Sequence, residues 1–264
     1  VTDVCGNFID VQQLIVIMDT QAPVMDPPPA AATVQCVGDI PAPTMLGYTD
    51  NCDAPGTVLS VDGPLVGGGC GGTVTRTWTA TDICGNISAA VTQTFTVMDN
   101  IPPTAGTPTA ISVECFANIP VPDGTVVPST ADNCSAVLTV NFVGDVSDGL
   151  SCPETITRTY AVVDDCGNQI TVDQTIVVND ITPPTASNPV AASYPLITDV
   201  PAGDLSVGDV FDEADNCPAS PTVTWVSDVS DNDICAGETI TRTFSVMDDC
   251  GNEIFVTQLI SIDP

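Results

Sequence analysis

The sequence repeats itself, and this repetition constrains the fold more than any other feature. Asp-x-Cys-Gly-Asn occurs four times, at Asp3 to Asn7, Asp82 to Asn86, Asp164 to Asn168 and Asp248 to Asn252. Three copies follow a Thr-Arg-Thr-aromatic phrase, which ends at Trp78, Tyr160 and Phe244. Asp-Asn-Cys recurs at residues 50–52, 132–134 and 215–217. These markers keep one order with a period of roughly 80 residues, which predicts a tandem array of similar units.

The markers divide the 264 residues into three complete repeats and the end of an earlier one. We expect residues 1–19 to be the closing strand of a preceding repeat, followed by repeats at 20–99, 100–180 and 181–264. The strands that would complete the first partial repeat are expected either upstream in a longer chain or in a neighbouring molecule.

Within each repeat, short runs of alternating β-branched residues are separated by Gly, Pro and Asp/Asn turns, as in β-strands. In the second repeat, strands are predicted at residues 111–115, 137–143, 155–163 and 169–178. The 23 prolines and the absence of a long helical period argue against helices. The predicted fold class is all-β: tandem immunoglobulin-like β-sandwiches of about seven strands each, braced by disulfides in an elongated rod.

The charge composition excludes several classes of function. The chain has 34 acids, three arginines, no lysine and no histidine, for a net charge of −31. This charge disfavours nucleic acid as a partner, and the absence of a long apolar run disfavours direct membrane insertion. Histidine, the usual general base, and lysine, the usual Schiff-base former, are both missing. The carboxylates of Asp164 and Asp165 are adjacent on a strand and so point to opposite faces, unlike a glycosidase pair. We therefore expect no enzymatic activity.

The twelve cysteines predict disulfides and hence an oxidising, extracellular compartment. The first two repeats carry four cysteines each, whereas the third has Tyr194 at the position of the first cysteine. Spacings of 18 and 14 residues between successive cysteines do not match the close pairs of a zinc site.

Four cysteines allow three pairings, and strand direction favours one of them. If the repeats join end to end, the second and fourth cysteines lie at the entry pole of a repeat, and the first and third lie at its exit pole. We therefore predict pairing within each repeat, as Cys52–Cys84, Cys134–Cys166, Cys217–Cys250, Cys36–Cys70 and Cys115–Cys152. This pairing leaves Cys5 and Cys235 without partners.

The same argument gathers oxygen-bearing side chains at the joints between repeats. The candidate ligands are Asp99, Asn100, Asp132, Asp164, Asp165, Asp180, Asp215, Asp248 and Asp249, with Asp19, Asp50 and Asp82 at the first joint. Calcium takes roughly six to eight oxygen ligands, so carboxylates from separate loops could hold it there. The alternative is that these Asp and Asn residues simply form turns.

The three arginines, Arg76, Arg158 and Arg242, occupy one repeat position. They could anchor a ligand, but we favour a structural role in which each pairs with a nearby acid or stacks on an aromatic ring. The aromatic residue two positions later is expected to lie in the core.

The segment from Thr73 to Asn86, followed by Gln93 to Val97 and a Pro-Pro joint, resembles hyalin-repeat-type (HYR-like), immunoglobulin-like modules. Such modules fill large secreted surface proteins of Bacteroidota, including gliding adhesin-like proteins. The resemblance implies an extracellular location at a bacterial cell surface, a role in adhesion or in a stalk, and no enzymatic activity.

Three functions therefore compete. The leading hypothesis is a structural stalk segment of a long surface adhesin or extracellular fibre, whose partners are neighbouring repeats or identical chains. The first alternative is a filament subunit, in which residues 1–19 add a strand to a neighbouring chain. The second is a module that binds a surface glycan or protein through its pole loops.

Overall fold

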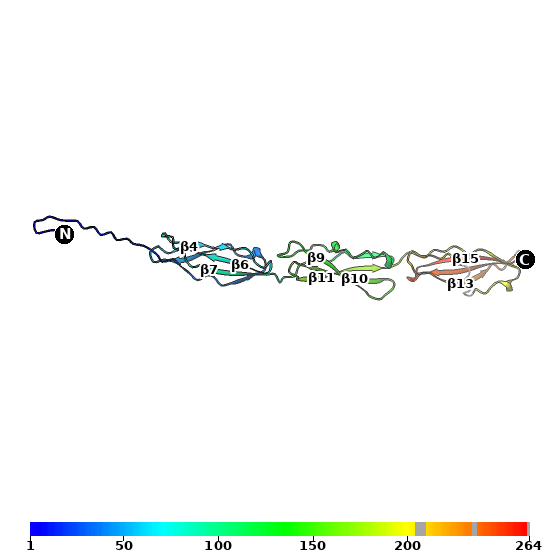
Figure 1. The fold of residues 1–264 in the computed structure, drawn as a ribbon. Helices are drawn as coiled ribbons and strands as arrows, with labels where there is room; N and C mark the ends of the chain where they lie inside the picture. Colours follow the sequence, from blue (N-terminus) through cyan, green and yellow to red (C-terminus); the bar gives the residue numbers. More distant parts are fainter. Residues whose placement is uncertain (204–209, 234–236, 263–264) are drawn as a thin grey trace. The chain divides into compact units, whose positions relative to one another are not determined.

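The computed structural model describes residues 1–203, 210–233 and 237–262, and it confirms the all-β fold class (Figure 1). The helices among these residues are single 3-10 turns: η1 (Val37–Asp39), η2 (Phe116–Asn118), η3 (Gly124–Val126) and η4 (Ile197–Asp199). No helix in the described ranges is long and apolar enough to cross a membrane.

Each repeat holds a four-stranded sheet of the same topology. In the first repeat, the order is β2 (Ala32–Val34), β7 (Val91–Met98), β6 (Cys70–Trp78) and β5 (Val61–Asp62). In the second, it is β8 (Ile111–Val113), β11 (Gln169–Val178), β10 (Glu154–Val163) and β9 (Thr139–Ser147). In the third, it is β12 (Ala192–Tyr194), β15 (Glu253–Ile262), β14 (Thr239–Met247) and β13 (Thr222–Ser230).

In each of these sheets, the strand that comes first in the chain (β2, β8 or β12) pairs in parallel with the strand that comes last (β7, β11 or β15). The remaining pairs are antiparallel. The last two strands form a hairpin across Asp-x-Cys-Gly-Asn, whose glycines Gly85, Gly167 and Gly251 have φ of 90°, 85° and 86°. A side chain is strained at such a φ, which explains glycine in the turn. The parallel pairing confirms the strand directions on which the pole argument depends.

The second layer of the sandwich differs from the prediction. The first repeat has seven strands because β1 (Val24–Met25), β3 (Met45–Thr49) and β4 (Gly56–Leu59) form an additional sheet. Among the described residues of the other two repeats, only the bridges Thr104–Ala131 and Thr185–Ala214 occupy the corresponding segments. In the second repeat this segment contains Pro128, whereas β3 of the first repeat contains no proline, and proline cannot donate to a strand ladder.

Alternate residues of the third strand face the core. In β10, the buried residues are Ile156, Arg158, Tyr160 and Val162. Tyr160 and Val162 pack with Val127 in one cluster. The equivalents Trp78 and Phe244 are also buried, so the prediction of a core aromatic is confirmed.

The chain forms two compact units. The first contains residues 1–101, 132–136 and 165–168. The second contains residues 102–131, 137–164 and 169–264. Two loops of the second repeat thus belong with the first repeat, and disulfides explain this division.

Candidate functional site: the joints between repeats

Four disulfides join consecutive repeats. Within the first unit, they are Cys36–Cys134 and Cys70–Cys166. Within the second unit, they are Cys115–Cys217 and Cys152–Cys250. In each case the first cysteine of one repeat bonds to the second of the next, and the third bonds to the fourth. The sequence separations are 98, 96, 102 and 98 residues.

The predicted pairing within repeats is therefore wrong, although the poles were assigned correctly. The pairs Cys36–Cys70, Cys115–Cys152, Cys134–Cys166 and Cys217–Cys250 do not form, and Cys52 and Cys84 are not bonded to each other. The second and fourth cysteines do lie at the entry of a repeat, where they meet the first and third cysteines from the exit of the preceding one. Opposed Cα atoms are 5.2–5.3 Å apart, within the range that a disulfide requires.

Three described cysteines form no disulfide: Cys5, Cys52 and Cys84, all exposed. For Cys5 this agrees with the prediction. Cys235, which was also predicted to be unpaired, lies outside the described residues. Desolvation raises the pKa of the Cys52 thiol, and the negative charge of Asp19 raises it further.

The aspartate that opens each Cys-Gly-Asn turn holds that turn together. Asp248 accepts backbone hydrogen bonds from Cys250 and Asn252 at 2.9 and 2.8 Å and a side-chain bond from Asn252 at 2.8 Å. Asp82 accepts the same two bonds from Asn86 at 2.7 Å. Both carboxylate oxygens of these two aspartates thus accept hydrogen bonds within the turn.

The asparagine of the same turn is tied to the joint. Its Nδ2 donates to the backbone carbonyl of the aspartate that precedes each Pro-containing linker. The pairs are Asn86 with Asp19 at 3.3 Å, Asn168 with Asp99 at 3.2 Å and Asn252 with Asp180 at 3.0 Å. The hairpin turn of each repeat is thereby bonded to the end of the preceding repeat's last strand.

The linker aspartate and the Asp-Asn-Cys aspartate each leave a buried oxygen without a partner. In Asp132, Oδ1 accepts the backbone N–H groups of Cys134 and Ser135, whereas Oδ2 is buried and unpartnered. Asp99 uses Oδ1 for the N–H of Ile101, and its Oδ2 is likewise unpartnered, although the residue is only 6% exposed. Two ionised oxygens without donors are costly unless a positive charge compensates them.

The same arrangement recurs at the other joints. Asp19 and Asp50 each have an unpartnered Oδ2, and one oxygen of each lies within 4.8 Å of the others in a set with Asp82. In the second unit, Asp180 and Asp215 approach within the same limit, and Oδ1 of Asp215 is unpartnered. The Sγ of Cys217 lies beside them, but it is bonded to Cys115 and is no thiolate ligand.

The joint within the second unit contains a cavity of about 210 Å³. Its walls include both disulfides of that unit and the acids Glu114, Glu154, Asp180, Asp215, Asp248 and Asp249. Glu114 Oε2 accepts 2.8 Å hydrogen bonds from Thr182 Oγ1 and from Asn216 Nδ2, so side chains of consecutive repeats are bonded here.

The predicted calcium ligands are thus brought together in part. Asp180, Asp215, Asp248 and Asp249 share one cavity, and Asp99 and Asp132 lie within 4.8 Å of each other in the first unit. Asp164 belongs to the second unit. The backbone N–H groups of Asn100 and Asp165 donate hydrogen bonds to Gln35 Oε1 and Ser135 Oγ, respectively. Glu114 and Asn216 were not predicted, because their only sequence signal is adjacency to Cys115 and Cys217.

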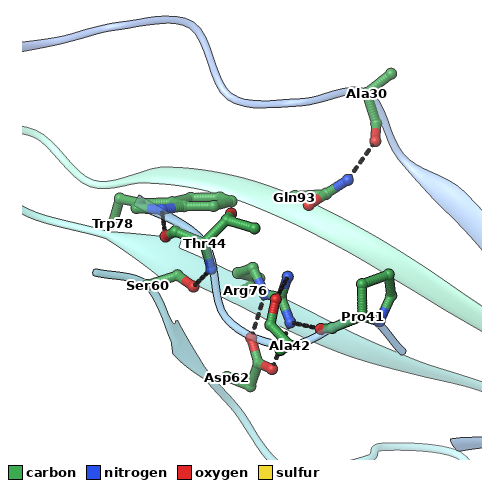
Figure 2. A network of polar contacts seen from close by, with 9 residues as sticks. All are labelled: Ala30, Pro41, Ala42, Thr44, Ser60, Asp62, Arg76, Trp78 and Gln93. Atoms are coloured by element: carbon green, nitrogen blue, oxygen red, sulfur yellow. Dashed lines mark hydrogen bonds and ion pairs between the residues drawn. The ribbon is translucent and has the colours of Figure 1, made fainter. Parts of the chain in front are cut away.

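The arginines form internal ion pairs, as predicted. Figure 2 shows Arg76 bonded to both carboxylate oxygens of Asp62, at 2.6 and 2.8 Å, and to the carbonyls of Pro41 and Ala42. Its guanidinium carbon lies 4.9 Å from the ring centre of Phe95. Arg158 pairs with Asp145 and Arg242 with Asp228 in the same way. With guanidinium groups almost fully buried, these side chains belong to the core and do not anchor a ligand.

Comparison with known proteins places this architecture in a family. The model of the HYR-like domain with 4 cysteines matches residues 24–97 and 103–178, together more than half of the chain. No curated protein gives a significant match.

Solved cadherin ectodomains are similar at low levels. Drosophila N-cadherin EC1-4 gives 11% identity and a TM-score of 0.31, over 94% of this chain and 76% of that one. The protocadherin gammaB7 EC3-6 cis-dimer gives 12% and 0.32, over 91% and 77%. Human desmocollin-1 gives 12% and 0.26, over 73% and 48%. These scores carry no argument about function. The family match, together with four cysteines in each of the first two repeats, shows that this chain belongs to the HYR-like domains with four cysteines.

Proposed function

We propose that the chain is a non-enzymatic, load-bearing stalk segment of a long extracellular surface adhesin or fibre. The observation that carries this proposal is the pair of disulfides at each of two successive joints. A single linker would leave consecutive repeats free to swing, whereas two bonds at separate points of one pole resist both bending and separation. The disulfides, which persist in oxidising compartments, also support secretion.

The disulfides also shorten the covalent path that carries tension. From Val1 the path can pass through Cys36 to Cys134, continue to Cys152, cross to Cys250 and reach Pro264. This path contains roughly 70 residues, or about 230 Å when fully extended. Pairing within repeats would leave roughly 160 residues, or about 540 Å.

Stretching single molecules between their termini tests this role. With oxidised protein, we expect extension to stop at about 230 Å, and after addition of a reductant at about 900 Å. The reduced protein is the matched control for the attachment chemistry. An oxidised chain that extends to 540 Å or beyond would show that the joints do not carry the load, and the stalk proposal would fail.

We further propose that the joints bind calcium. The support is the recurrence of paired aspartates with unpartnered, buried oxygens, Asp19 with Asp50 and Asp99 with Asp132. An oxygen-rich, histidine-free site suits a hard cation. Asp180 and Asp215 would hold the ion at the joint within the second unit, where Glu114 lines the same cavity.

Calcium binding is measured by the melting temperature with excess calcium and with a chelator. We expect calcium to raise the melting temperature, since an ion that binds only the folded state stabilises it. Asp215→Asn should reduce this increase, whereas Asp173→Asn, on an exposed part of β11, should not. An identical melting temperature in calcium and chelator would remove calcium from the proposal and leave the disulfide-joined stalk intact.

Residues 8–18 favour a second candidate, a filament subunit that donates a strand to a neighbouring chain. This segment is apolar and exposed, with Leu14 at 87% and Ile17 at 87% exposure. Electron micrographs of purified protein would show filaments if it assembles in this way, and isolated particles if it does not.

A further inference from the structure

We propose that residues 8–18, together with Cys52 and Cys84, form a docking site for a preceding four-cysteine repeat, which closes it with two disulfides. The partner is the body of that preceding repeat, meaning all of the repeat before its last strand, which residues 8–18 supply. Its first cysteine would bond to Cys52 and its third to Cys84. The inference deepens the proposed stalk function, because it extends the same joint in the N-terminal direction.

The cysteine positions carry the first part of the argument. Cys52 and Cys84 are the second and fourth cysteines of their repeat, equivalent to Cys134 and Cys166. The equivalent pairs in both later repeats are bonded to the first and third cysteines of the repeat before them. Cys52 and Cys84 are the only such pair among the described residues that is exposed and unbonded.

The turns around the two thiols are already formed. Cys52 N–H donates to Asp50 Oδ1 at 2.9 Å, as Cys134 N–H does to Asp132. Asn86 Nδ2 donates to the carbonyl of Asp19, as Asn252 does to that of Asp180. The turns that carry Cys52 and Cys84 therefore make the same hydrogen bonds as turns that carry disulfide-bonded cysteines in the later repeats.

The N-terminal segment supplies the second, independent observation. When Asn7 is aligned with Asn252, residues Val11, Gln13, Ile15 and Ile17 correspond to Val256, Gln258, Ile260 and Ile262 of β15. All four residues of β15 are buried. In residues 8–18 the same positions are exposed, and Ile15 is 73% exposed where Ile260 is 1% exposed.

Gln13 indicates what should cover this segment. Its equivalents Gln93, Gln174 and Gln258 each donate Nε2 to a carbonyl just before the strand that pairs in parallel with their own (β2, β8 and β12), at 2.7, 2.9 and 3.0 Å. The missing partners of residues 8–18 are therefore the first strand, which would lie parallel, and the strand before Asp3, which would lie antiparallel. Both belong to the body of a HYR-like repeat.

The sequence argues against a second copy of this chain as the occupant. The third repeat of such a copy would present Tyr194 where the first cysteine is needed, so it cannot supply both disulfides. Each bond forms when two thiols lose two protons and two electrons to a disulfide oxidant, which is reduced to two thiols.

The test extends the chain by the missing body. A copy of residues 100–163 replaces Val1 and Thr2 and directly precedes Asp3, so that copies of Cys115 and Cys152 become the first and third cysteines of the added repeat. The protein is oxidised in a glutathione buffer, digested with an aspartate-specific protease without reduction, and analysed by mass spectrometry. Hydrogen exchange at residues 8–18 is measured in parallel, and a variant in which the added copies of Cys115 and Cys152 are changed to serine is the control.

We expect peptides that join Cys52 to a Cys115 sequence and Cys84 to a Cys152 sequence. These peptides should be absent from the serine control, in which only the original Cys115 and Cys152 remain. Residues 8–18 should gain protection in both the extended chain and its serine control. A Cys52–Cys84 bond, a bond between the added copies of Cys115 and Cys152, or cross-links between separate copies would overturn the inference. None of these results would alter the stretching behaviour of the unextended chain, so the stalk proposal is tested separately.

Discussion

At the residue scale, the chain uses its three cations in one way. Each arginine lies on the core face of its strand, pairs with one aspartate of the neighbouring strand and reaches backbone carbonyls of an adjoining segment. The sequence predicted the ion pairs because one arginine at a fixed repeat position needs an acid nearby. The sequence did not predict that the arginine is buried beside the core aromatic. Residues two apart in a strand point to the same face, but the spacing does not say whether that face is the core or the solvent.

Asp62 gives this pairing a pH dependence. The hydrogen bonds from Arg76 lower the pKa of Asp62 below its ordinary value of 3.8. A lowered folded-state pKa stabilises the protein above the ordinary value, and this contribution disappears as pH falls through the folded-state pKa. Asp62→Asn should therefore cost about 2 kcal/mol near pH 7, where it leaves a buried guanidinium without its counter-ion.

The measurement is denaturant unfolding followed by Trp78 fluorescence, in a Trp225→Phe background that removes the other tryptophan. We expect the difference between parent and Asp62→Asn to shrink below about pH 4. Asp26→Asn, at an exposed acid, controls for the loss of one negative charge. A difference that stays constant from pH 7 to pH 3 would contradict the assignment.

At the element scale, the alternation of β-branched residues located the strands of the second repeat well. The predicted last strand coincides with β11, and the predicted third strand differs from β10 by one residue. The second strand was placed two residues early and ended too soon, because β9 continues through Gly144 and a bulge opposite Thr159 and Tyr160. Local propensity carries no signal for a bulge that tertiary packing imposes.

In every repeat, a buried glutamine on the last strand is hydrogen-bonded to the segment before the short strand that pairs in parallel with it. Gln174 on β11 donates to the carbonyl of Thr109, just before β8. Gln174→Met keeps the volume but removes the donor, which should cost about 1 kcal/mol and loosen β8. Faster hydrogen exchange is expected at residues 109–113, whereas Thr175→Ser, at the exposed neighbouring position, should leave exchange unchanged. Unchanged exchange in Gln174→Met would show that the parallel pairing alone holds β8.

At the scale of the whole molecule, the pole assignment was predictable and the disulfide partners were not. Strand direction places two cysteines at each pole of a repeat. It does not say whether these two bond to each other or to the cysteines of the adjacent repeat. Tyr194 did not decide between the two choices, because the 264 residues contain no partner for Cys235 under either pairing and the second repeat is fully paired under both.

This pairing changes what the repeat is as a building block. A repeat that closed its own disulfides would be self-contained, whereas here the second repeat is bonded through two cysteines to the first repeat and through two others to the third. Each disulfide closes a segment of 96 to 102 residues, for which the chain-entropy model gives a stabilisation of about 4–5 kcal/mol. The array is thereby stabilised as a whole, and single repeats should not behave as independent folding units.

Disulfide mapping of the oxidised 264-residue chain tests whether the disulfides join consecutive repeats. Free thiols are first alkylated without reduction, the protein is digested, and the linked peptides are identified by mass spectrometry. We expect linked peptides for Cys115 with Cys217 and for Cys152 with Cys250, and alkylated Cys52 and Cys84. Linked peptides for Cys115 with Cys152 and for Cys217 with Cys250 would contradict this pairing.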